Sequence, residues 1–349
     1  MKKFESVAIT EEAHIGAAKR GIRRCANEAG FTERQLAEIE IAVNEIGSNA
    51  LKFGRGTGQI FFARTDREVE PAGLEIVYVD KGPGIEDTSA AVEDGFTTTG
   101  TLGTGLGAIK RMADEFYIFS NVQSHSRRLS THGRTTQGTA IVFRKCVAAA
   151  EEGEQRKALW GAMTRPSAGF EENGDAYIIR RYGDRQLIAM IDGLGHGLGA
   201  LQAAREAVAA IEASATQPVE SIIRSTHEAL RPTRGAVLGL AAIDCPTGVI
   251  EYAGIGNTDF RVLGGRSPIR FISFNGTLGS RLERFKVFKE QLPKVATLIM
   301  STDGISERWD VESYPGLLGL HPQLLCAVVM RDYSRSNDDA TILCGRLSF

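Results

Sequence analysis

Glu45, Asn49 and Lys52 are polar residues whose types and spacing could support metal binding or proton transfer. Residues four apart share one face of a helix, so the Glu45 carboxylate and the Asn49 carboxamide would lie side by side, with Lys52 near the same face. Such a pair can bind a hydrated Mg²⁺ and activate a hydroxyl group or a water. A solvated helix face has the same composition, so this triplet alone leaves both interpretations open.

Asp80, Gly82 and Gly84 follow an expected strand. A carboxylate at a strand end can accept a hydrogen bond from an exocyclic amine such as that of adenine, and glycines let the backbone approach a planar ligand. An ordinary turn explains the same residues. Further along, Thr139 follows a glycine and precedes another expected strand, where its hydroxyl could lie near the nucleotide.

Gly103, Gly105 and Gly107 alternate just before an expected helix. Backbone amides at the amino end of a helix form an anion site, for which phosphate is the obvious ligand. The pattern lacks the Gly-Lys-Ser/Thr ending of a Walker loop, and no strand leads directly into it as in a Rossmann motif. A glycine loop by itself is weak evidence.

Four aspartates in the second half lie beside glycines or at strand edges: Asp175, Asp192, Asp303 and Asp338. Their similar contexts predict that the carboxylates converge on one cluster, which needs hard cations such as Mg²⁺ or Mn²⁺. Two such metals about 3.5–4 Å apart can activate a water and bind a phosphoryl group. For any single Asp-Gly pair, a surface turn is an equally good interpretation.

The elements that would position these residues form two α+β halves. The pattern of the first half predicts helices at 11–29, 33–52 and 106–115 and strands at 59–64, 74–80, 116–122 and 139–146, with Thr32 as a helix N-cap. The second half predicts paired strands at 175–181 and 186–191, helices at 199–213 and 218–230, and strands at 236–243, 249–253, 259–263, 296–300 and 341–344. Residues 147–157 are small, polar and charged, which predicts a linker between domains at 1–146 and 158–349.

Composition excludes several classes of protein. The 349 residues include 41 Lys+Arg and 43 Asp+Glu, a balance that argues against a basic nucleic-acid binder. We find no apolar run near the ~18 residues of a membrane span and no signal-peptide pattern. The five cysteines contain no CxxC, which fits a reducing cytoplasm and predicts neither disulfides nor zinc. We therefore expect a cytoplasmic protein with no nucleic-acid or membrane partner.

The order of ExxxN, DxGxG, GxGxG and a late Gly-Thr over 95 residues resembles the GHKL (Bergerat-fold) ATPase family, which implies a mixed sheet covered by helices on one face. By this resemblance Glu45 corresponds to the general base, Asn49 to the Mg²⁺ ligand and Asp80 to the adenine contact. The remaining residues implied to contact ATP are Lys52, Gly82, Gly84, Gly103, Gly105, Gly107 and Thr139. Segments 49–60 and 94–116 look most like RsbT-type switch kinases, which phosphorylate Ser/Thr of small STAS-domain scaffold or antagonist proteins and then engage a downstream regulator.

The order GD, DGxGHG, TDG and DDAT resembles type 2C (PPM) protein phosphatases of the SpoIIE subgroup, which implies an α-β-β-α sandwich and two Mg²⁺ or Mn²⁺ ions. The implied metal ligands are Asp175, Asp192, the Gly193 carbonyl, Asp303 and Asp338. In the family the position that corresponds to Asp339 is often not a ligand, which leaves the role of Asp339 open, and the resemblance implies that His196 shapes a turn. Segments 234–244, 254–259 and 276–279 look most like RsbX-type phosphatases, a group that dephosphorylates the STAS proteins that RsbT-type kinases phosphorylate.

Together the two resemblances imply a fusion of a switch kinase with its opposing phosphatase. The STAS partner would be similar to RsbS, RsbR or an anti-sigma antagonist. Two alternatives stay open: a nucleotide-dependent, anti-sigma-like binding module with little kinase turnover, and a phosphatase that its ATP-binding half regulates. Related kinases often dimerise, so a homodimer also stays open.

Overall fold

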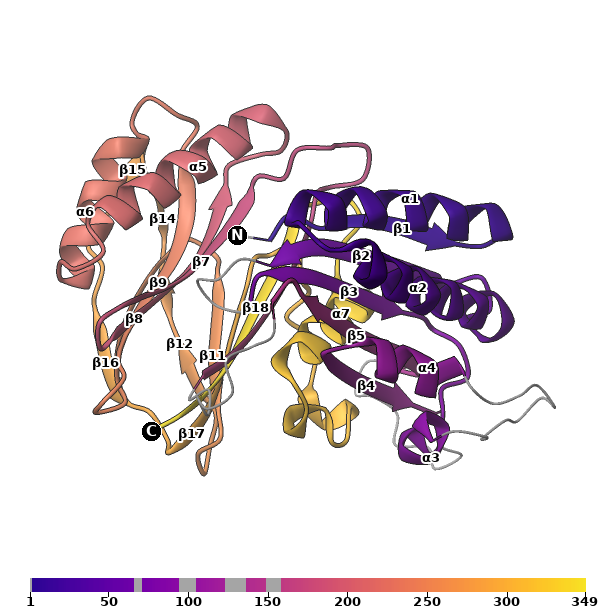
Figure 1. The fold of residues 1–349 in the computed structure, drawn as a ribbon. Helices are drawn as coiled ribbons and strands as arrows, with labels where there is room; N and C mark the ends of the chain where they lie inside the picture. The colour runs from indigo at the N-terminus through magenta and orange to yellow at the C-terminus, as the bar shows by residue number, and fades with distance from the viewer. Residues whose placement is uncertain (1, 66–70, 94–104, 123–135, 149–157) are drawn as a thin grey trace. The chain divides into compact units, whose positions relative to one another are not determined.

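The computed structural model describes residues 2–65, 71–93, 105–122, 136–148 and 158–349 (Figure 1). The chain divides into two compact units. The N-terminal unit comprises Lys2–Glu154 together with Asp310–Asp332, and the C-terminal unit comprises Gln155–Trp309 together with Tyr333–Phe349. The chain therefore passes from one unit to the other three times. The domain expected at 158–349 was continuous, whereas Asp310–Asp332 within it belongs to the N-terminal unit. Asp310–Asp332 is called the crossing segment below.

The N-terminal unit is built on a five-stranded sheet in the order β1-β2-β3-β5-β4. Its strands are β1 (Glu5–Ile9), β2 (Gly58–Thr65), β3 (Gly73–Val79), β4 (Glu115–Asn121) and β5 (Gly138–Cys146). All four strand pairs are antiparallel, so the expectation of a mixed sheet is wrong for these strands. Strand β1, which was not predicted from the sequence, pairs with β2 at the sheet edge.

Helices cover one face of this sheet, as Figure 1 shows. They are α1 (Glu12–Ala29), α2 (Glu33–Phe53) and α4 (Gly105–Met112), and a short α3 (Thr88–Val92) precedes α4. Helix α1 ends at Gly30, whose φ of 89° suits glycine, and α2 begins with a capping box between Thr32 and Gln35. These local signals explain why the boundaries of α1 and α2 were predictable. Helix α4 stops at Met112, three residues before the predicted end, because Glu115 already pairs in β4.

The opposite face of the sheet carries a buried charge cluster. Glu75 on β3 is fully buried and accepts hydrogen bonds from Lys2 Nζ at 2.8 Å and Arg144 Nε at 2.5 Å. Arg144 also donates to Glu115 Oε2 at 3.0 Å. Because each charge has a partner of opposite sign, the desolvation penalty of this cluster is offset.

The C-terminal unit contains two sheets that face one another. The first sheet has the order β13-β10-β9-β8-β7, with β16 also pairing with β10, and the second has the order β12-β11-β17-β18-β6. Helices α5 (Leu198–Ala213) and α6 (Val219–Leu230) pack on the outer face of the first sheet. On its inner face, Tyr252 contacts Phe260 and Phe271 of the second sheet, with ring centroids 5.0 and 4.9 Å apart. A two-sheet sandwich results, as the resemblance implied.

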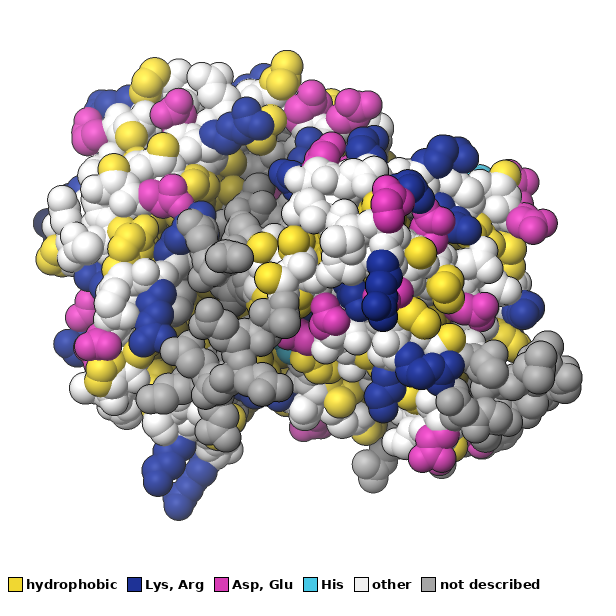
Figure 2. All heavy atoms as spheres, in the orientation of Figure 1, with side chains coloured by type: hydrophobic (Ala, Val, Ile, Leu, Met, Phe, Trp, Pro, Cys, Tyr) yellow, Lys and Arg dark blue, Asp and Glu magenta, His cyan; other side chains and the backbone are white. Residues whose placement is uncertain are grey.

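The strand bounds of this unit extend the predicted ones by a few residues. They are β6 (Ala158–Arg165), β7 (Asp175–Tyr182), β8 (Arg185–Gly193), β9 (Ala236–Asp244), β10 (Val249–Ile255), β11 (Asp259–Leu263), β12 (Ile269–Phe271), β13 (Ser273–Phe274), β14 (Gly276–Thr277), β15 (Arg281–Leu282), β16 (Phe288–Gln291), β17 (Val295–Ser301) and β18 (Ala340–Ser348). Strands β6 and β12 to β16, most of which are short, were not predicted from the sequence. On the face that Figure 2 shows, acidic and basic side chains are intermingled, in keeping with the near-zero net charge.

The crossing segment contains two short 3₁₀ helices and most of helix α7. These elements are η1 (Val311–Ser313), η2 (Leu317–Gly319) and α7 (Pro322–Tyr333). Seven consecutive residues of α7, Leu324–Met330, are each at most 3% exposed, so this helix is buried on all sides. A helix that is apolar all round shows no 3.6-residue stripe, which is why periodicity did not predict it.

Candidate functional sites

Glu45 and Asn49 lie together at the amino end of α4. A Cβ atom built on Gly105 would be 3.1 Å from Glu45 Oε2 and 3.5 Å from Asn49 Nδ2. A side chain at position 105 would therefore crowd both groups, and glycine leaves the space beside them open. Lys52, in the last turn of α2, is exposed. The structure thus places Glu45 and Asn49 on one helix face, as their spacing predicted, and also brings Gly105 beside them.

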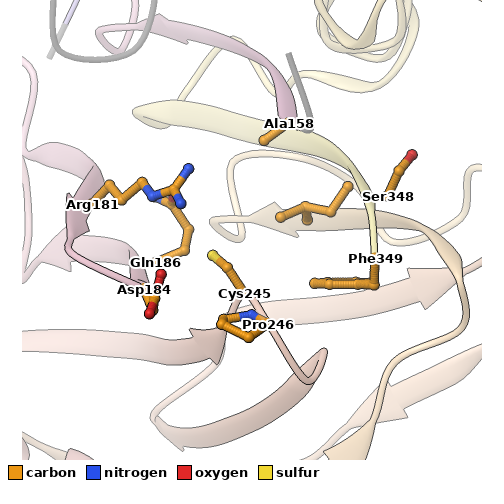
Figure 3. Close-up of a pocket in the computed structure, with 9 residues that line it drawn as sticks. Ala158, Arg181, Asp184, Gln186, Cys245, Pro246, Ser348 and Phe349 are labelled. Atoms are coloured by element: carbon orange, nitrogen blue, oxygen red, sulfur yellow. The ribbon is translucent and has the colours of Figure 1, made fainter. Parts of the chain in front are cut away.

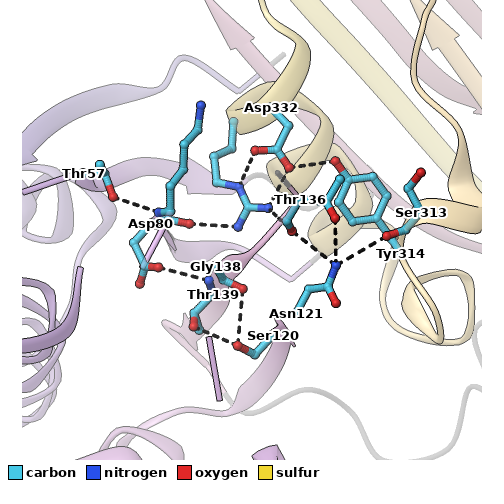
Figure 4. Close-up of polar contacts among 12 residues, drawn as sticks. Thr57, Asp80, Ser120, Asn121, Thr136, Gly138, Thr139, Ser313, Tyr314 and Asp332 are labelled. Carbon is cyan, nitrogen blue, oxygen red and sulfur yellow. Dashed lines mark hydrogen bonds and ion pairs between the residues drawn. The ribbon is translucent and has the colours of Figure 1, made fainter. Parts of the chain in front are cut away.

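Asp80 lies immediately after β3 and is 5% exposed (Figure 4). Its Oδ1 accepts hydrogen bonds from the backbone N–H groups of Gly82 at 2.7 Å and Thr139 at 3.1 Å, and its Oδ2 accepts one from Tyr78 Oη at 2.7 Å. A carboxylate has about four acceptor positions, and donors from the described residues occupy three of them, so one position on Oδ2 remains there for an amine donor. Burial and then the Asp80 charge raise the pKa of Tyr78, which keeps the phenol protonated as a donor.

The glycines around Asp80 permit close backbone approaches. Gly84 has a φ of 82°, and Gly138 has a φ of 129° with a built Cβ only 2.0 Å from the Asp80 carbonyl oxygen. The Thr139 hydroxyl shares a 2.9 Å hydrogen bond with Ser120 Oγ. Gly107 is buried within α4, whereas Gly103 lies outside the described residues.

In the C-terminal unit, Asp175 and Asp192 are directly opposite in the antiparallel pair β7–β8. Asp175 is 1% exposed, and its Oδ2 accepts a 2.7 Å hydrogen bond from the Thr302 hydroxyl. Gly193 follows Asp192, and a built Cβ on it would be 2.2 Å from the Ala200 carbonyl oxygen. Glycine at this position lets the start of α5 approach the end of β8.

Asp303 and Asp338 come from the ends of neighbouring strands β17 and β18. Asp303 Oδ2 accepts a 2.7 Å hydrogen bond from Asn257 Nδ2, and Asp338 Oδ1 accepts one from the Asp339 backbone. A built Cβ on Gly304 would be 1.8 Å from the Asp339 carbonyl oxygen, so glycine is required there. This close approach brings the TDG and DDAT motifs together.

The electrostatics of the four carboxylates show that they interact. Burial raises the pKa of Asp175 well above its usual value, Asp192 raises it further, and hydrogen bonds from Thr302 and Thr341 oppose the shift. Burial and then Asp303 and Asp338 raise the pKa of Asp192 to about 7. Burial and Asp338 also raise the pKa of Asp303. Mutually repelling carboxylates of this kind are the donor set that a divalent cation neutralises.

Among the described residues, no group of three or more His, Cys, Asp or Glu side chains is close enough to hold a metal ion as the side chains stand. The carboxylates fit a divalent cation in donor chemistry and in charge. The described side chains do not, however, lie at the distances that metal coordination requires. Oxygen ligands and several negative charges suit Mg²⁺ or Mn²⁺ rather than a softer metal.

Asp339 differs from Asp338 in its contacts. It is 3% exposed, and its two oxygens accept backbone hydrogen bonds from Ser167 and Gly174, both at 2.7 Å. Both oxygens are thus engaged in holding loops together. His196 is exposed and packs on Phe170 with ring centroids 4.4 Å apart, between two glycines of positive φ, which agrees with a role in the turn.

Several polar residues at the two sites were not predicted from the sequence. Thr302 and Asn257 each donate to a candidate ligand, and the adjacent Ser-Thr-Asp sequence was the available signal for Thr302. Arg331, far away in sequence, donates to the Asp80 carbonyl oxygen, and no local pattern points to it.

A pocket of about 190 Å³ lies elsewhere in the C-terminal unit, near the β7–β8 turn (Figure 3). Arg181, Asp184 and Cys245 contribute to its lining. Arg181 is six residues along β7 from Asp175, about 20 Å in an extended strand. This pocket is therefore remote from the carboxylates and plays no part in the candidate metal site. None of the five cysteines, all of which lie in the described residues, forms a disulfide bond.

The chain is similar to known proteins in two separate parts. The family described as "Histidine kinase-like ATPase domain" matches residues 9–130, and the family described as "Stage II sporulation protein E (SpoIIE)" matches residues 182–348. The serine/threonine-protein kinase RsbT of Bacillus subtilis (strain 168) is 41% identical over 121 residues, which are 34% of this chain and 89% of that protein. The phosphoserine phosphatase RsbX of the same organism is 27% identical over 177 residues, which are 50% of this chain and 87% of RsbX.

Among solved structures, a chain from the structure titled "The bacterial stressosome: a modular system that has been adapted to control secondary messenger signaling" matches with a TM-score of 0.52 and 28% identity. The match covers 54% of this chain and 99% of that one. These similarities confirm the expected α+β fold class and the order of the two domains. No described helix has the length and apolar character needed to span a lipid bilayer.

Proposed function

Because the chain belongs to the RsbT-type family of histidine kinase-like ATPase domains and continues into a SpoIIE domain, we propose that it is a bifunctional signalling enzyme. Its N-terminal domain would phosphorylate Ser or Thr of a STAS-domain protein, and its C-terminal domain would remove the phosphoryl group. The observation that carries the kinase proposal is the placement of Glu45 and Asn49 together beside Gly105, at the amino end of α4.

In the kinase step, the Ser or Thr oxygen of the partner attacks the γ-phosphorus of ATP, and Glu45 accepts the proton of that hydroxyl group. The bond from the γ-phosphorus to the bridging oxygen breaks, and ADP leaves. Asn49 would hold Mg²⁺, which supplies charge neutralisation on the phosphates when bound. The free acceptor position of Asp80 would receive the adenine amine. Gly82, Gly84, Gly103, Gly105 and Gly107, with Lys52 and Thr139, are the residues proposed to surround the nucleotide.

In the phosphatase step, Asp175, Asp192, Asp303 and Asp338 with the Gly193 carbonyl would hold two Mg²⁺ or Mn²⁺ ions. Bound ions of this kind supply Lewis-acid chemistry and lower the pKa of water. Thr302 and Asn257 orient the carboxylates through their 2.7 Å hydrogen bonds. Water attacks the phosphorus of the phosphorylated residue, the P–O bond to the Ser or Thr oxygen breaks, and inorganic phosphate leaves.

Fusion of the two activities keeps both at one partner and raises their effective concentration there. It also creates a futile cycle unless the partner, the nucleotide, the metal or a downstream regulator favours one activity. The partner proposed is a STAS-domain protein similar to RsbS, RsbR or an anti-sigma antagonist.

The kinase proposal is tested by incubating the chain with a STAS-domain protein and γ-labelled ATP. We expect labelling by the wild type and by Glu40→Gln, a matched change on the outside of α2, and loss of labelling by Glu45→Ala. Equal labelling by wild type and Glu45→Ala would refute the base assignment.

The phosphatase proposal is tested with the labelled STAS-domain protein and Mn²⁺ in the absence of ATP. We expect Asp192→Asn to lose phosphate release, while Asp184→Asn, at the far end of the same hairpin, retains it. Undiminished release by Asp192→Asn would refute the metal-site assignment.

A second candidate function is a nucleotide-dependent binding module that controls the phosphatase with little kinase turnover. The hydrogen bond from Arg331, which lies within the phosphatase sequence, to the Asp80 carbonyl oxygen favours it. In that case phosphate release would depend on ATP and would survive Glu45→Ala.

A further inference from the structure

The crossing segment leaves the phosphatase sequence between two candidate metal ligands. It begins seven residues after Asp303 and ends six residues before Asp338. Although the segment lies within the sequence of the SpoIIE domain, it is part of the N-terminal unit. A displacement of the crossing segment would therefore be transmitted along the backbone to the residues that carry Asp303 and Asp338.

The crossing segment packs on strand β4 of the ATPase sheet. The His321 ring stacks on Tyr117 with centroids 4.6 Å apart, and Tyr314 meets the edge of Phe119 at 6.3 Å. Asn121 Nδ2 also donates to the Ser313 carbonyl oxygen at 3.4 Å. Tyr117, Phe119 and Asn121 alternate along the strand, so one face of β4 contacts the segment.

Arg331 links the crossing segment to the strand ends at the candidate nucleotide site. Figure 4 shows three of its hydrogen-bond partners, Asp80, Thr136 and Asp332. Its Nη1 donates to the Asp80 carbonyl oxygen at 2.9 Å, and its Nη2 donates to the Thr136 carbonyl oxygen at 3.4 Å. The side chain is 3% exposed and is held by Asp332, which in turn accepts a 2.7 Å hydrogen bond from Tyr314 Oη. The guanidinium is therefore fixed against the residue whose carboxylate has one acceptor position left.

The residues that follow Arg331 are fixed beside Asp303. The Tyr333 carbonyl oxygen accepts a 3.0 Å hydrogen bond from Ser306 N, and Ser334 forms a β-bridge with Ile305. Arg335 N donates to the Gly304 carbonyl oxygen at 2.8 Å. Arg331, which contacts Asp80, is thus only four positions before Arg335, which contacts the neighbour of Asp303.

We propose that the crossing segment couples the two sites, so that nucleotide bound at Asp80 and metal-dependent phosphatase activity at Asp303 and Asp338 influence one another through Arg331. This inference rests on the proposed nucleotide and metal sites. Arg331 is a positioning residue here, since it holds the Asp80 backbone and touches neither adenine nor phosphate. Coupling between two sites is reciprocal, so each ligand changes the affinity for the other by the same factor, typically about 5- to 150-fold.

Nucleotide binding is measured first, on the full chain with Mg²⁺, by titrating the non-hydrolysable analogue AMP-PNP in a calorimeter. We expect Arg331→Ala to weaken AMP-PNP binding about fivefold or more, because the Asp80 backbone loses a charged donor. The AMP-PNP affinity of Arg331→Lys is expected to lie between those of the wild type and Arg331→Ala. Arg231→Ala removes an arginine of an exposed ion pair and is expected to bind as the wild type does. Tyr314→Phe, which removes only the hydroxyl group that donates to Asp332, provides a milder variant if Arg331→Ala does not fold.

Phosphatase activity is then measured with p-nitrophenyl phosphate and Mn²⁺, with and without saturating AMP-PNP. We expect the nucleotide to change the apparent Mn²⁺ affinity of the wild type and of Arg231→Ala severalfold, and to change that of Arg331→Ala much less. The ratio of the apparent Mn²⁺ affinities with and without AMP-PNP, measured for each variant, separates coupling from a general loss of stability.

The possible outcomes separate the coupling from the proposed function. Equal AMP-PNP affinities of wild type and Arg331→Ala, or a wild-type Mn²⁺ affinity that AMP-PNP leaves unchanged, would overturn the coupling while leaving the proposed function intact. A wild type that binds no AMP-PNP would instead overturn the proposed nucleotide site.

Discussion

Replacement of Glu75 by glutamine tests whether the buried charge cluster stabilises the N-terminal unit. Burial raises the pKa of this carboxyl, but the charges of Arg144 and Lys2 outweigh burial and lower it to about 2. A pKa lowered from 4.5 to about 2 corresponds to about 3 kcal/mol of stability at neutral pH. The substituted amide would keep the shape of the side chain but leave the buried Arg144 with Glu115 as its remaining carboxylate partner and Lys2 without its own, so we expect a loss of that size.

The pH dependence has a definite sign. Because the folded-state pKa lies below the unfolded value, the stabilisation is fully present above about pH 4.5 and is lost as the pH falls through about 2. The difference in stability between wild type and Glu75→Gln should therefore be largest at neutral pH and should shrink steadily as the pH falls below the unfolded value.

The assay must report on the correct unit. Trp160 and Trp309 both belong to the C-terminal unit, so their fluorescence does not follow unfolding around Glu75. Hydrogen exchange of β3 in increasing urea provides a local free energy of unfolding instead. Glu28→Gln is the matched control, because Glu28 forms an exposed ion pair with Arg64 in the same unit and is expected to change little. Equal protection of β3 in wild type and Glu75→Gln at neutral pH would refute this reasoning.

Three further predictions concern the two sites. Asp339→Asn replaces one acceptor oxygen by a donor, so one buried backbone N–H loses its partner, and tryptophan fluorescence in urea should show a loss of about 1–3 kcal/mol in the C-terminal unit. Gly138→Ala places a Cβ about 2.0 Å from the Asp80 carbonyl oxygen and should weaken AMP-PNP binding at least tenfold, a result that calorimetry would contradict if the affinity is unchanged. Asn257→Ala removes the hydrogen bond to Asp303 and should raise the Mn²⁺ concentration needed for half-maximal hydrolysis of p-nitrophenyl phosphate. An unchanged Mn²⁺ concentration would show that Asn257 does not orient Asp303.

Local signals account for the part of the fold that was predictable. Gly30 and Thr32 marked the junction of two helices because one ends a helix in a left-handed conformation and the other caps the next. The spacing of Glu45 and Asn49 likewise fixed their common helix face. Very short strands such as β12, which has three residues, carry too few residues for alternation to be recognised.

Long-range placement was not predictable from the sequence alone. Asp80 and Arg331 are separated by 251 positions, and nothing near either residue indicates that they meet. The hydrogen-bond donors around the carboxylates show the same limit, since Asn257 reaches Asp303 from a different strand connection. The order of the motifs identified the aspartates proposed as metal ligands. The side chains that donate hydrogen bonds to these aspartates are brought to them by tertiary packing, which the motifs do not indicate.

The three passages of the chain between the units have a practical consequence for dissecting the protein. A fragment that ends in the 147–157 region would lack the crossing segment that contacts β4, and the complementary fragment would carry that segment without its sheet. A protease that cuts only in this region is therefore expected to yield two polypeptides that stay associated until they are denatured. Deleting one half to study the other would remove part of the half that is kept, so inactivating point substitutions are the sound way to separate the two activities.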